Sequence, residues 1–426
     1  MELWMLILII FIITVLLIST RVVHHTSAAL FGAVAASIAL FMNGFTDQEI
    51  LAMVRLEPIL VISGMTVVAE VMRSAGVFQF LVVYFIRLTR GDPKRLFAIF
   101  FLLTAVLSTV LLNSVVILIM GYLVILTCHA LEIKPHGFFL GEILAVGAGG
   151  AFTLIGTTPN IIIADYAGFG FGYYIIQFGI LTLIVNAVSL VAVFYLIRHQ
   201  LTVEDSKAFE RVMDLDPWMM VPNRRLFWVY GFLFAILIAA FVLFPQPYVV
   251  ALGGMTVFMT VSHSDPGTSL RDIEWDIIFF IGGLFVLAGS LELAGILGII
   301  SNAILSASGG QLIPASLLLL WGSWAGTFVI GGPPIATVFA PLVVDMSTVM
   351  NWSIGVRDPL FWGVGFGSAL GGVATPFGTV PLLVLSMLSF EKSEVSWRRF
   401  LVNAILVNIL QIVICSIYIV IFILFL

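Results

Sequence analysis

The stretch Gly149–Asn160, which reads GGAFTLIGTTPN, decides the fold because a second copy, GGVATPFGTVPL, begins at Gly371. The shared positions are Gly149, Gly150, Thr153, Gly156, Thr157 and Pro159, which recur as Gly371, Gly372, Thr375, Gly378, Thr379 and Pro381. Each copy lies in a long apolar run, where Gly and Pro interrupt a helix and leave backbone groups unpaired unless the break lines a cavity. Matching breaks in two halves of a chain indicate the binding site of a membrane carrier.

The composition places the chain in a lipid bilayer. Of its 426 residues 61% are hydrophobic and only 10% are charged, with a mean hydropathy of +1.19. Soluble domains carry about 25% charged residues. We therefore predict an all-α polytopic membrane protein. The small net charge of -5 gives no reason to expect nucleic acid, and two cysteines in apolar surroundings indicate neither a disulfide framework nor a thiol metal site.

The apolar runs predict about ten transmembrane helices, each long enough for roughly 30 Å of hydrocarbon. Two runs are too long for one helix and are interrupted, the first by Asn113-Ser114 and the second by Gly331-Gly332-Pro333-Pro334. Each predicts a re-entrant hairpin, over about 96–128 and about 312–345. The two Gly-rich motifs predict broken helices over about 138–170 and about 360–388.

A polar linker, 199–225, divides the chain into two repeats, 1–198 and 226–426. Shifting one repeat by 219 positions places Glu57 on Asp276 and Gly76 on Gly295. Each half is predicted to have five spans, and an odd number turns the second copy over. The halves are therefore expected to be inverted repeats.

The distribution of basic residues predicts the orientation. In this arrangement nearly all Lys and Arg fall on one face, and only Arg55 and Arg357 fall on the other. The crowded face is cytoplasmic by the positive-inside rule. We expect a multi-pass protein of the cell inner membrane, with a cytoplasmic linker and both termini outside.

The helix breaks supply the candidate substrate-binding residues. Broken helices direct helix N-termini and free carbonyls at a bound solute. The candidates are Asn113, Ser114, Thr153, Gly156, Thr157, Pro159, Asn160, Gly332, Pro333, Thr375, Gly378 and Thr379. The alternative is structural, because small residues also let membrane helices approach closely and a lone Asn also joins helices.

No Asp, Glu, Lys, Arg or His lies in either hairpin tip or either motif. An uncharged, polyol-like solute would fit this chemistry more easily than an ion. Glu70 and Glu142 lie nearby and are candidates for proton coupling, since charges at membrane depth are functional by default. Alternatively, Glu70 forms a structural pair with Arg73, three residues away, and Glu142 lies in the headgroup zone.

The histidines suggest no metal site. All six, which include His24 and His25, lie at loop edges, and none is spaced like a metal-ligand pair in a helix. We expect no metal and no cofactor. No convergent nucleophile and base is visible, so an enzyme is not predicted.

The inverted halves, the Asn-containing hairpin and the motif GGAFTLIGTTPN resemble the ion transporter superfamily, above all the branch of arsenite permeases, P-protein type carriers and sodium/proton antiporters. The resemblance covers nearly the whole chain. It implies Asp-Asn at the first tip, where this chain has Asn113-Ser114, and Gly-Asp-Pro-Pro-Asn in the unwound motif, where it has Gly156–Asn160. The second tip, often Asp-Asn or Asn-Asn, is Gly332-Pro333 here.

These departures remove the carboxylates that the resemblance would assign to sodium or protons. Arsenite as As(OH)3 is a neutral hydrogen-bonding solute that matches hydroxyls, amides and carbonyls. Our leading hypothesis is therefore proton-coupled arsenite and antimonite efflux by alternating access. Sodium/proton antiport and sodium-coupled anion or carboxylate transport remain alternatives. A cytosolic ATPase subunit on the basic loops and a homodimer, as in other branches, stay open as partners beside the lipid bilayer.

Overall fold

The structure, a computed structural model, describes residues 2–90, 92–201, 216–262, 266–271, 273–373, 375, 379–390 and 397–425. Regular structure in these ranges is helical. The first half contains α1 (Leu3–Thr20), α2 (His25–Met42), α3 (Asp47–Ala52), α4 (Leu56–Ser74), α5 (Val77–Leu88), α6 (Pro93–Ser108), α7 (Asn113–Ala130), α8 (His136–Gly150), α9 (Thr158–Ala167) and α10 (Phe171–Ile197). The second half contains α12 (Arg224–Leu243), α13 (Pro247–Ser262), α14 (Pro266–Arg271), α15 (Trp275–Leu293), α16 (Ile296–Ala307), α17 (Leu312–Ile330), α18 (Gly332–Val349), α19 (Asp358–Gly371), α20 (Thr379–Phe390) and α21 (Trp397–Leu424). Two short 3-10 helices, Arg198–Gln200 and Pro217–Met220, lie between the halves.

The helices have the length and composition of membrane spans. Within the described residues eight helices can cross a membrane, or nine if the bent pair α4–α5 is one span. The expected polytopic helical class is confirmed. This count is not the same as the predicted ten spans plus two hairpins, because it includes the second-hairpin helices α17 and α18 and omits shorter apolar helices such as α7 and α13.

The helix breaks occur where the sequence predicts them. In the first long run α6 ends at Ser108 and α7 begins at Asn113. In the second, α17 ends at Ile330 and α18 begins at Gly332, with Gly331 at a φ of 91°. Asn113 is thus the first residue of a helix, where backbone N–H groups lack partners within that helix.

The two halves repeat the same order of helices. The turn between α4 and α5 contains Gly76 at a φ of 75°, and the turn between α15 and α16 contains Gly295 at 76°. A side chain would disfavour this left-handed conformation, so glycine is retained at both turns. The α4–α5 pair is bent by 56° there. The 219-residue correspondence of the sequence is therefore reproduced by backbone geometry.

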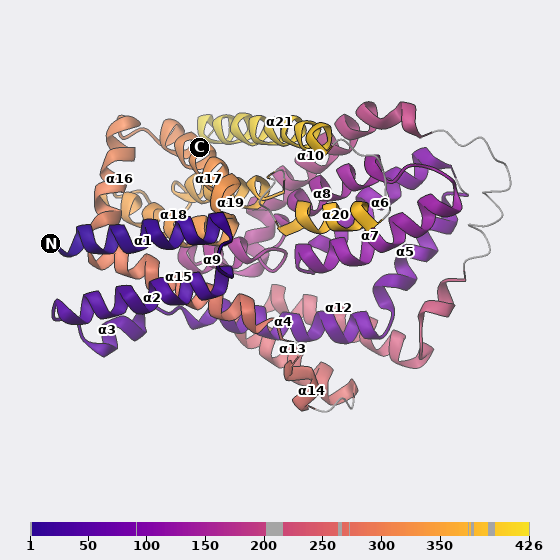
Figure 1. Cartoon of the computed structure of the whole chain (residues 1–426), viewed down its shortest axis with the longest axis horizontal. Coiled ribbons are helices and arrows are strands. Elements are labelled where there is room, and N and C mark those ends of the chain that lie inside the picture. The colour runs from indigo at the N-terminus through magenta and orange to yellow at the C-terminus, as the bar shows by residue number, and fades with distance from the viewer. Residues whose placement is uncertain are drawn as a thin grey trace.

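The halves exchange their first helix pairs. Helix α2 packs against α15 of the second half, while α13 packs against α4 of the first half. In Figure 1 the indigo α1 and α2 accordingly lie beside α15, and the pink α12 and α13 lie beside α4. Two reciprocal exchanges lock the halves into one core.

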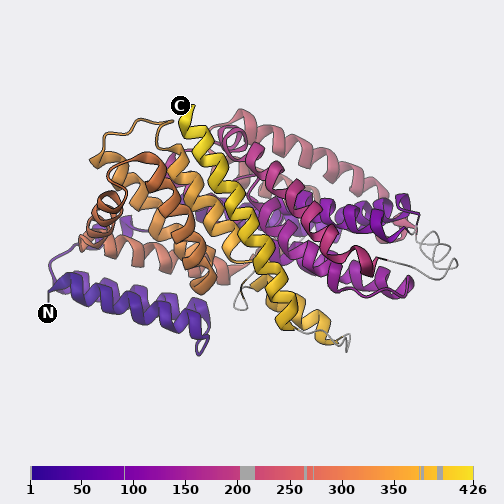
Figure 2. The ribbon, with the colours of Figure 1, turned by 90° about the horizontal axis from the view of Figure 1, so that it is seen from above.

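The last helices of the halves also meet. Helix α21 contacts α10, and Gln411 Nε2 donates to Ser189 Oγ at 2.8 Å between two fully buried residues. Figure 2 shows α21 crossing the molecule diagonally, with orange helices of the second half on one side and magenta helices of the first on the other. Ser189 and Gln411 are 222 positions apart, the same separation as the two Gly-rich motifs.

Candidate functional site

The first Gly-rich motif forms a pinned turn between two half-helices. Helix α8 ends at Gly150 and α9 begins at Thr158. Across the gap the Asn160 amide Nδ2 donates to the carbonyl oxygens of Gly150 at 2.8 Å and Thr153 at 2.9 Å. Asn160 is fully buried. Its side chain thus satisfies carbonyls that the break would leave unpaired, which buried backbone requires.

The tip of the first hairpin lies directly on this turn. The Thr153 hydroxyl donates to the carbonyl of Thr109, and the Ser108 hydroxyl lies 2.9 Å from Asn113 Oδ1. A Cβ added to Gly150 would lie 2.5 Å from Thr157 Cγ2 and 3.0 Å from Asn113 Oδ1. The structure therefore brings Asn113, Thr153, Thr157 and Asn160 into one cluster.

The second half repeats these contacts. Thr375, the counterpart of Thr153, donates its hydroxyl to the carbonyl of Phe328 at 2.7 Å. Phe328 follows Thr109 by 219 positions. An added Cβ on Gly371 would lie 2.7 Å from the Trp324 carbonyl oxygen, which leaves no room for a side chain. Each motif is therefore fixed to its own hairpin by the same device.

The tip of the second hairpin lies against the first Gly-rich motif. A Cβ added to Gly332 would lie 2.7 Å from the carbonyl oxygen of Ser368 and 2.8 Å from Pro159 Cγ. Helix α18 packs on α9, and reciprocally α20 packs on α7. The Pro333 carbonyl accepts from the Thr337 hydroxyl at 2.7 Å, so that carbonyl is already paired. Among the described residues, Gly332 of the second half thus lies against Pro159 of the first half.

Some predicted site residues contribute less. Ser114 is half-buried on the first turn of α7. A Cβ added to Gly156 would lie 2.4 Å from the carbonyl oxygen of Gly150 and 2.7 Å from that of Ser108, so a side chain does not fit there. Thr379 is the first residue of α20. Gly378 lies outside the described residues.

Polar atoms without partners remain inside the cluster. Thr157 Oγ1 and Asn160 Oδ1 are buried, and neither has a hydrogen-bond partner among the described residues. Among the described residues, no side chain forms a capping hydrogen bond at the N-terminus of α7 or of α9. Buried polar atoms and orphan helix N–H groups cost free energy unless a ligand or water satisfies them. The cluster therefore has the chemistry of a site for a small polar solute.

Two cavities lie along α4 at opposite ends. The larger, of about 150 Å³, is lined by Glu57 and Asp165, and the smaller, of about 60 Å³, by Glu70 and Leu112. Glu57 and Glu70 are about 20 Å apart along the helix axis, at 1.5 Å per residue. Both cavities include Ile161, which directly follows the central Asn160. Ile161, next in sequence to a member of the cluster, is therefore a lining residue of both cavities.

The two candidate proton carriers have different surroundings. Glu70 forms a bidentate pair with Arg73, whose Nε and Nη2 each lie 2.7 Å from a carboxylate oxygen. Glu142 is 1% exposed, and neither of its oxygens has a partner among the described residues. This burial is within the protein, so the headgroup alternative for Glu142 stays open. Glu70 is a satisfied pair, whereas Glu142 is a buried and unpartnered acid.

Charged residues surround the cavities rather than the cluster. At the larger cavity Arg55 pairs with Asp165 and lies 4.2 Å from the ring centre of Tyr166. At the smaller cavity burial raises the pKa of Glu274, and the neighbouring charge of Asp276 raises it further. Both cavities are therefore lined in part by ionisable groups, which the hairpin tips and the first motif lack.

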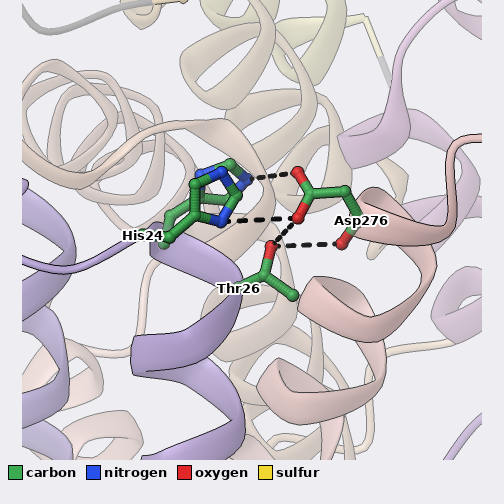
Figure 3. A network of polar contacts seen from close by, with 4 residues as sticks. His24, Thr26 and Asp276 are labelled. Atoms are coloured by element: carbon green, nitrogen blue, oxygen red, sulfur yellow. Dashed lines mark hydrogen bonds and ion pairs between the residues drawn. The ribbon is translucent and has the colours of Figure 1, made fainter.

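Three residues outside this cluster have the chemistry of metal ligands. His24, His25 and Asp276 each offer a ligand atom, and these atoms lie within 4.8 Å of one another (Figure 3). Residue spacing within one helix does not reveal this group. Asp276 is separated from His24 by half the chain, and only the packing of α2 on α15 brings them together.

Comparison with known proteins identifies the family. The family described as "CitMHS: Citrate transporter" matches residues 7–362, which include both hairpins and the first motif. The chain belongs to the CitMHS family. It is therefore a membrane transporter and not an enzyme, as the sequence predicts.

Similar proteins agree with this assignment. An uncharacterized transporter of Mycobacterium tuberculosis is 28% identical over 418 residues, which cover 96% of each chain. The human P protein is 22% identical over 448 residues, which cover 85% of this chain and 53% of the P protein. The fold is similar to the YdaH transporter of Alcanivorax borkumensis, with a TM-score of 0.63 at 14% identity, covering 89% of this chain and 87% of that one.

Proposed function

We propose that this CitMHS family member moves a small, oxygen-bearing solute by alternating access, with the solute bound between the first hairpin tip and the first motif. The observation that carries this proposal is the pair of buried unpartnered atoms, Thr157 Oγ1 and Asn160 Oδ1. A hydroxyl can donate and an amide oxygen can accept, so together they match a solute with O–H groups.

Alternating access is supported by the two cavities. They lie at opposite ends of α4, and both reach Ile161. Among the described residues neither cavity is lined by Thr157 or Asn160. We propose that inverted repeats move against each other so that one cavity at a time opens past Ile161 to the cluster, as in other carriers built from broken helices.

Arsenite and antimonite are the substrates that we propose first. As the neutral trihydroxides they need hydrogen bonds but no counter-charge. The cluster provides hydroxyls, amides and backbone N–H groups, with no ionisable side chain in either tip or in Thr153–Asn160. Efflux of these solutes is the function that this uncharged chemistry supports best.

A carboxylate anion is the second candidate. The family description names citrate, and the uncapped N-termini of α7 and α9 carry partial positive charge that attracts anions. Sodium/proton antiport is less well supported because the cluster lacks the carboxylates that would bind either cation.

For coupling we propose Glu142 rather than Glu70. A buried acid without partners is costly to ionise, so its proton is held or released according to access to water. Glu70 is already paired with Arg73. Proton coupling through Glu142 needs no ATPase subunit. A cytosolic ATPase subunit and a homodimer stay proposals, and no interface for either is identified among the described residues.

We also propose the inner-membrane orientation that the basic residues indicate, with the linker cytoplasmic and both termini outside. Cysteines placed singly in the linker and near the N-terminus, in a variant lacking Cys128 and Cys415, test this directly. A membrane-impermeant maleimide added to intact cells should label the terminal site and not the linker. Labelling of the linker would reverse the orientation.

The experiment that tests the function uses purified protein in proteoliposomes with an imposed pH gradient. Uptake of arsenite, antimonite, citrate and sodium is measured against protein-free vesicles. We expect arsenite and antimonite to enter at a rate that collapses with a protonophore. Citrate uptake without arsenite uptake would favour the second candidate, and sodium exchange for protons alone would refute both.

A further inference from the structure

An ion-sized group of ligands connects the two halves of the protein. His24 and His25 lie at the start of α2, and Asp276 lies in the first turn of α15 (Figure 3). His24 Nδ1 is 3.5 Å from Asp276 Oδ1, and His25 Nε2 is 3.2 Å from Asp276 Oδ2. Two imidazoles and a carboxylate converge on one point from both repeats.

These separations match those of ligands around a tetrahedral metal. Zinc lies about 2.0–2.1 Å from histidine nitrogen and carboxylate oxygen, so two ligands at the tetrahedral angle are about 3.4 Å apart. The 3.5 Å and 3.2 Å separations, which reach the two different oxygens of Asp276, are close to that value, and one ligand atom from each of the three residues lies within 4.8 Å of the others. A set of two nitrogens and one carboxylate suits Zn²⁺ with water in the fourth position.

The carboxylate is held in place by a neighbouring hydroxyl. Thr26 Oγ1 donates to Asp276 Oδ1 and lies 3.2 Å from the Asp276 backbone carbonyl. A fixed outer partner of this kind orients a metal-ligating carboxylate. The side chains of His24, His25 and Asp276 are 61%, 40% and 47% exposed, so an ion can reach all three.

The repeat supplies an internal comparison that separates metal binding from packing. Helix α13 packs on α4 as α2 packs on α15, and Cβ atoms added to Gly64 and Gly283 would meet the backbone of Ala251 and Ala29. Ala29 and Ala251 occupy equivalent places and are 222 positions apart. By the same shift, the positions that correspond to the two histidines are Gln246 and Pro247. The same helix pairing therefore forms without imidazoles, so the fold does not require them.

We propose that His24, His25 and Asp276 form a binding site for Zn²⁺ that joins α2 of the first half to α15 of the second. The site is distinct from the solute cluster, which contains no ionisable side chain in its tips or first motif. Bound Zn²⁺ stabilises the α2–α15 pair because it binds the folded state and links two segments far apart in sequence.

The test uses the full-length protein, purified in detergent and stripped of metal with EDTA. Isothermal titration with ZnCl₂ should show one site per chain, and Zn²⁺ should raise the melting temperature. We expect His24→Ala, His25→Ala and Asp276→Asn each to weaken binding at least tenfold and to lose the melting shift. Asp276→Asn keeps an acceptor for Thr26 and thus preserves the local hydrogen bond.

His199→Ala is the matched control, because His199 is an exposed histidine in the 3-10 helix after α10. It should bind Zn²⁺ as the parent does. Co²⁺ substitution adds a readout independent of stability, since tetrahedral Co²⁺ absorbs strongly in the visible range and octahedral Co²⁺ weakly. Parent-like Zn²⁺ affinity in Asp276→Asn, or equal weakening by His199→Ala, would overturn the site and leave a simple His–carboxylate ion pair.

Discussion

Replacing Thr157 by Val separates the function of the cluster from its stability. Val keeps the shape of Thr and removes only the hydroxyl, whose oxygen is buried without a partner among the described residues. An unsatisfied buried hydroxyl costs about 1–3 kcal/mol. Its removal should therefore leave the unfolding free energy unchanged or raise it by about 1 kcal/mol.

Transport should respond in the opposite sense. A solute oxygen that loses its partner at Thr157 and stays unpaired costs about 1–3 kcal/mol. At 1.4 kcal/mol per factor of ten, the apparent KM of Thr157→Val should rise by about 5- to 140-fold. The assay is initial uptake into proteoliposomes of the solute that the substrate panel identifies, with melting temperature measured on the same preparation.

Thr182 provides the matched control. Its hydroxyl is also buried without a partner among the described residues, but it lies in α10 outside the cluster. Thr182→Val should change the melting temperature as little as Thr157→Val does, and it should leave the KM of uptake unchanged. A parent-like KM in Thr157→Val would show that the hydroxyl is packing and does not contact the solute. A fall of several degrees in melting temperature would refute the structural premise.

Three further predictions follow from single contacts. Glu142→Gln should fold normally and lose proton-driven uptake while retaining exchange of solute for solute, whereas parent-like uptake driven by pH would exclude Glu142 as the carrier. Gly371→Ala should destabilise the protein by about 1–3 kcal/mol through overpacking, since its Cβ would lie 2.7 Å from the Trp324 carbonyl oxygen, and Gly282→Ala, with nothing within 4 Å, should not lower the melting temperature. Because burial raises the pKa of Glu274 in the folded state, ionising it there is unfavourable, so stability falls as pH rises through that pKa. Glu274→Gln should therefore raise the melting temperature near neutral pH and leave it unchanged below pH 4. A larger increase in melting temperature in acid than at neutral pH would contradict the prediction.

Periodicity and breakers in the sequence predicted most of the helix ends. The Gly-rich motif placed a break that the structure has between Gly150 and Thr158, and its copy placed the break after Gly371. These ends are local, because Gly and Pro act on the chain within a few residues. An apolar run does not reveal where its helix ends, so shorter apolar helices such as α13 fall outside the spans counted among the described residues.

The candidate site was proposed from the sequence as a set of residues, without the hydrogen bonds between them. The sequence nominated Asn113, Thr153, Thr157 and Asn160, and it could not tell which of their polar atoms the backbone would consume. The structure assigns the Asn160 amide nitrogen to two carbonyls and leaves Thr157 Oγ1 unpartnered. Hydrogen-bond partners come from neighbouring segments, and those segments are set by packing.

The sequence by itself determined the membrane class, the duplication and the uncharged chemistry of the helix breaks, because composition and breaker residues act locally. Only the tertiary structure decided which segments meet. It placed Gly332 of one half on Pro159 of the other, distinguished the paired Glu70 from the unpartnered Glu142, and joined His24 to Asp276. Such contacts arise from helices that pack across hundreds of residues, and no local pattern in the chain encodes them.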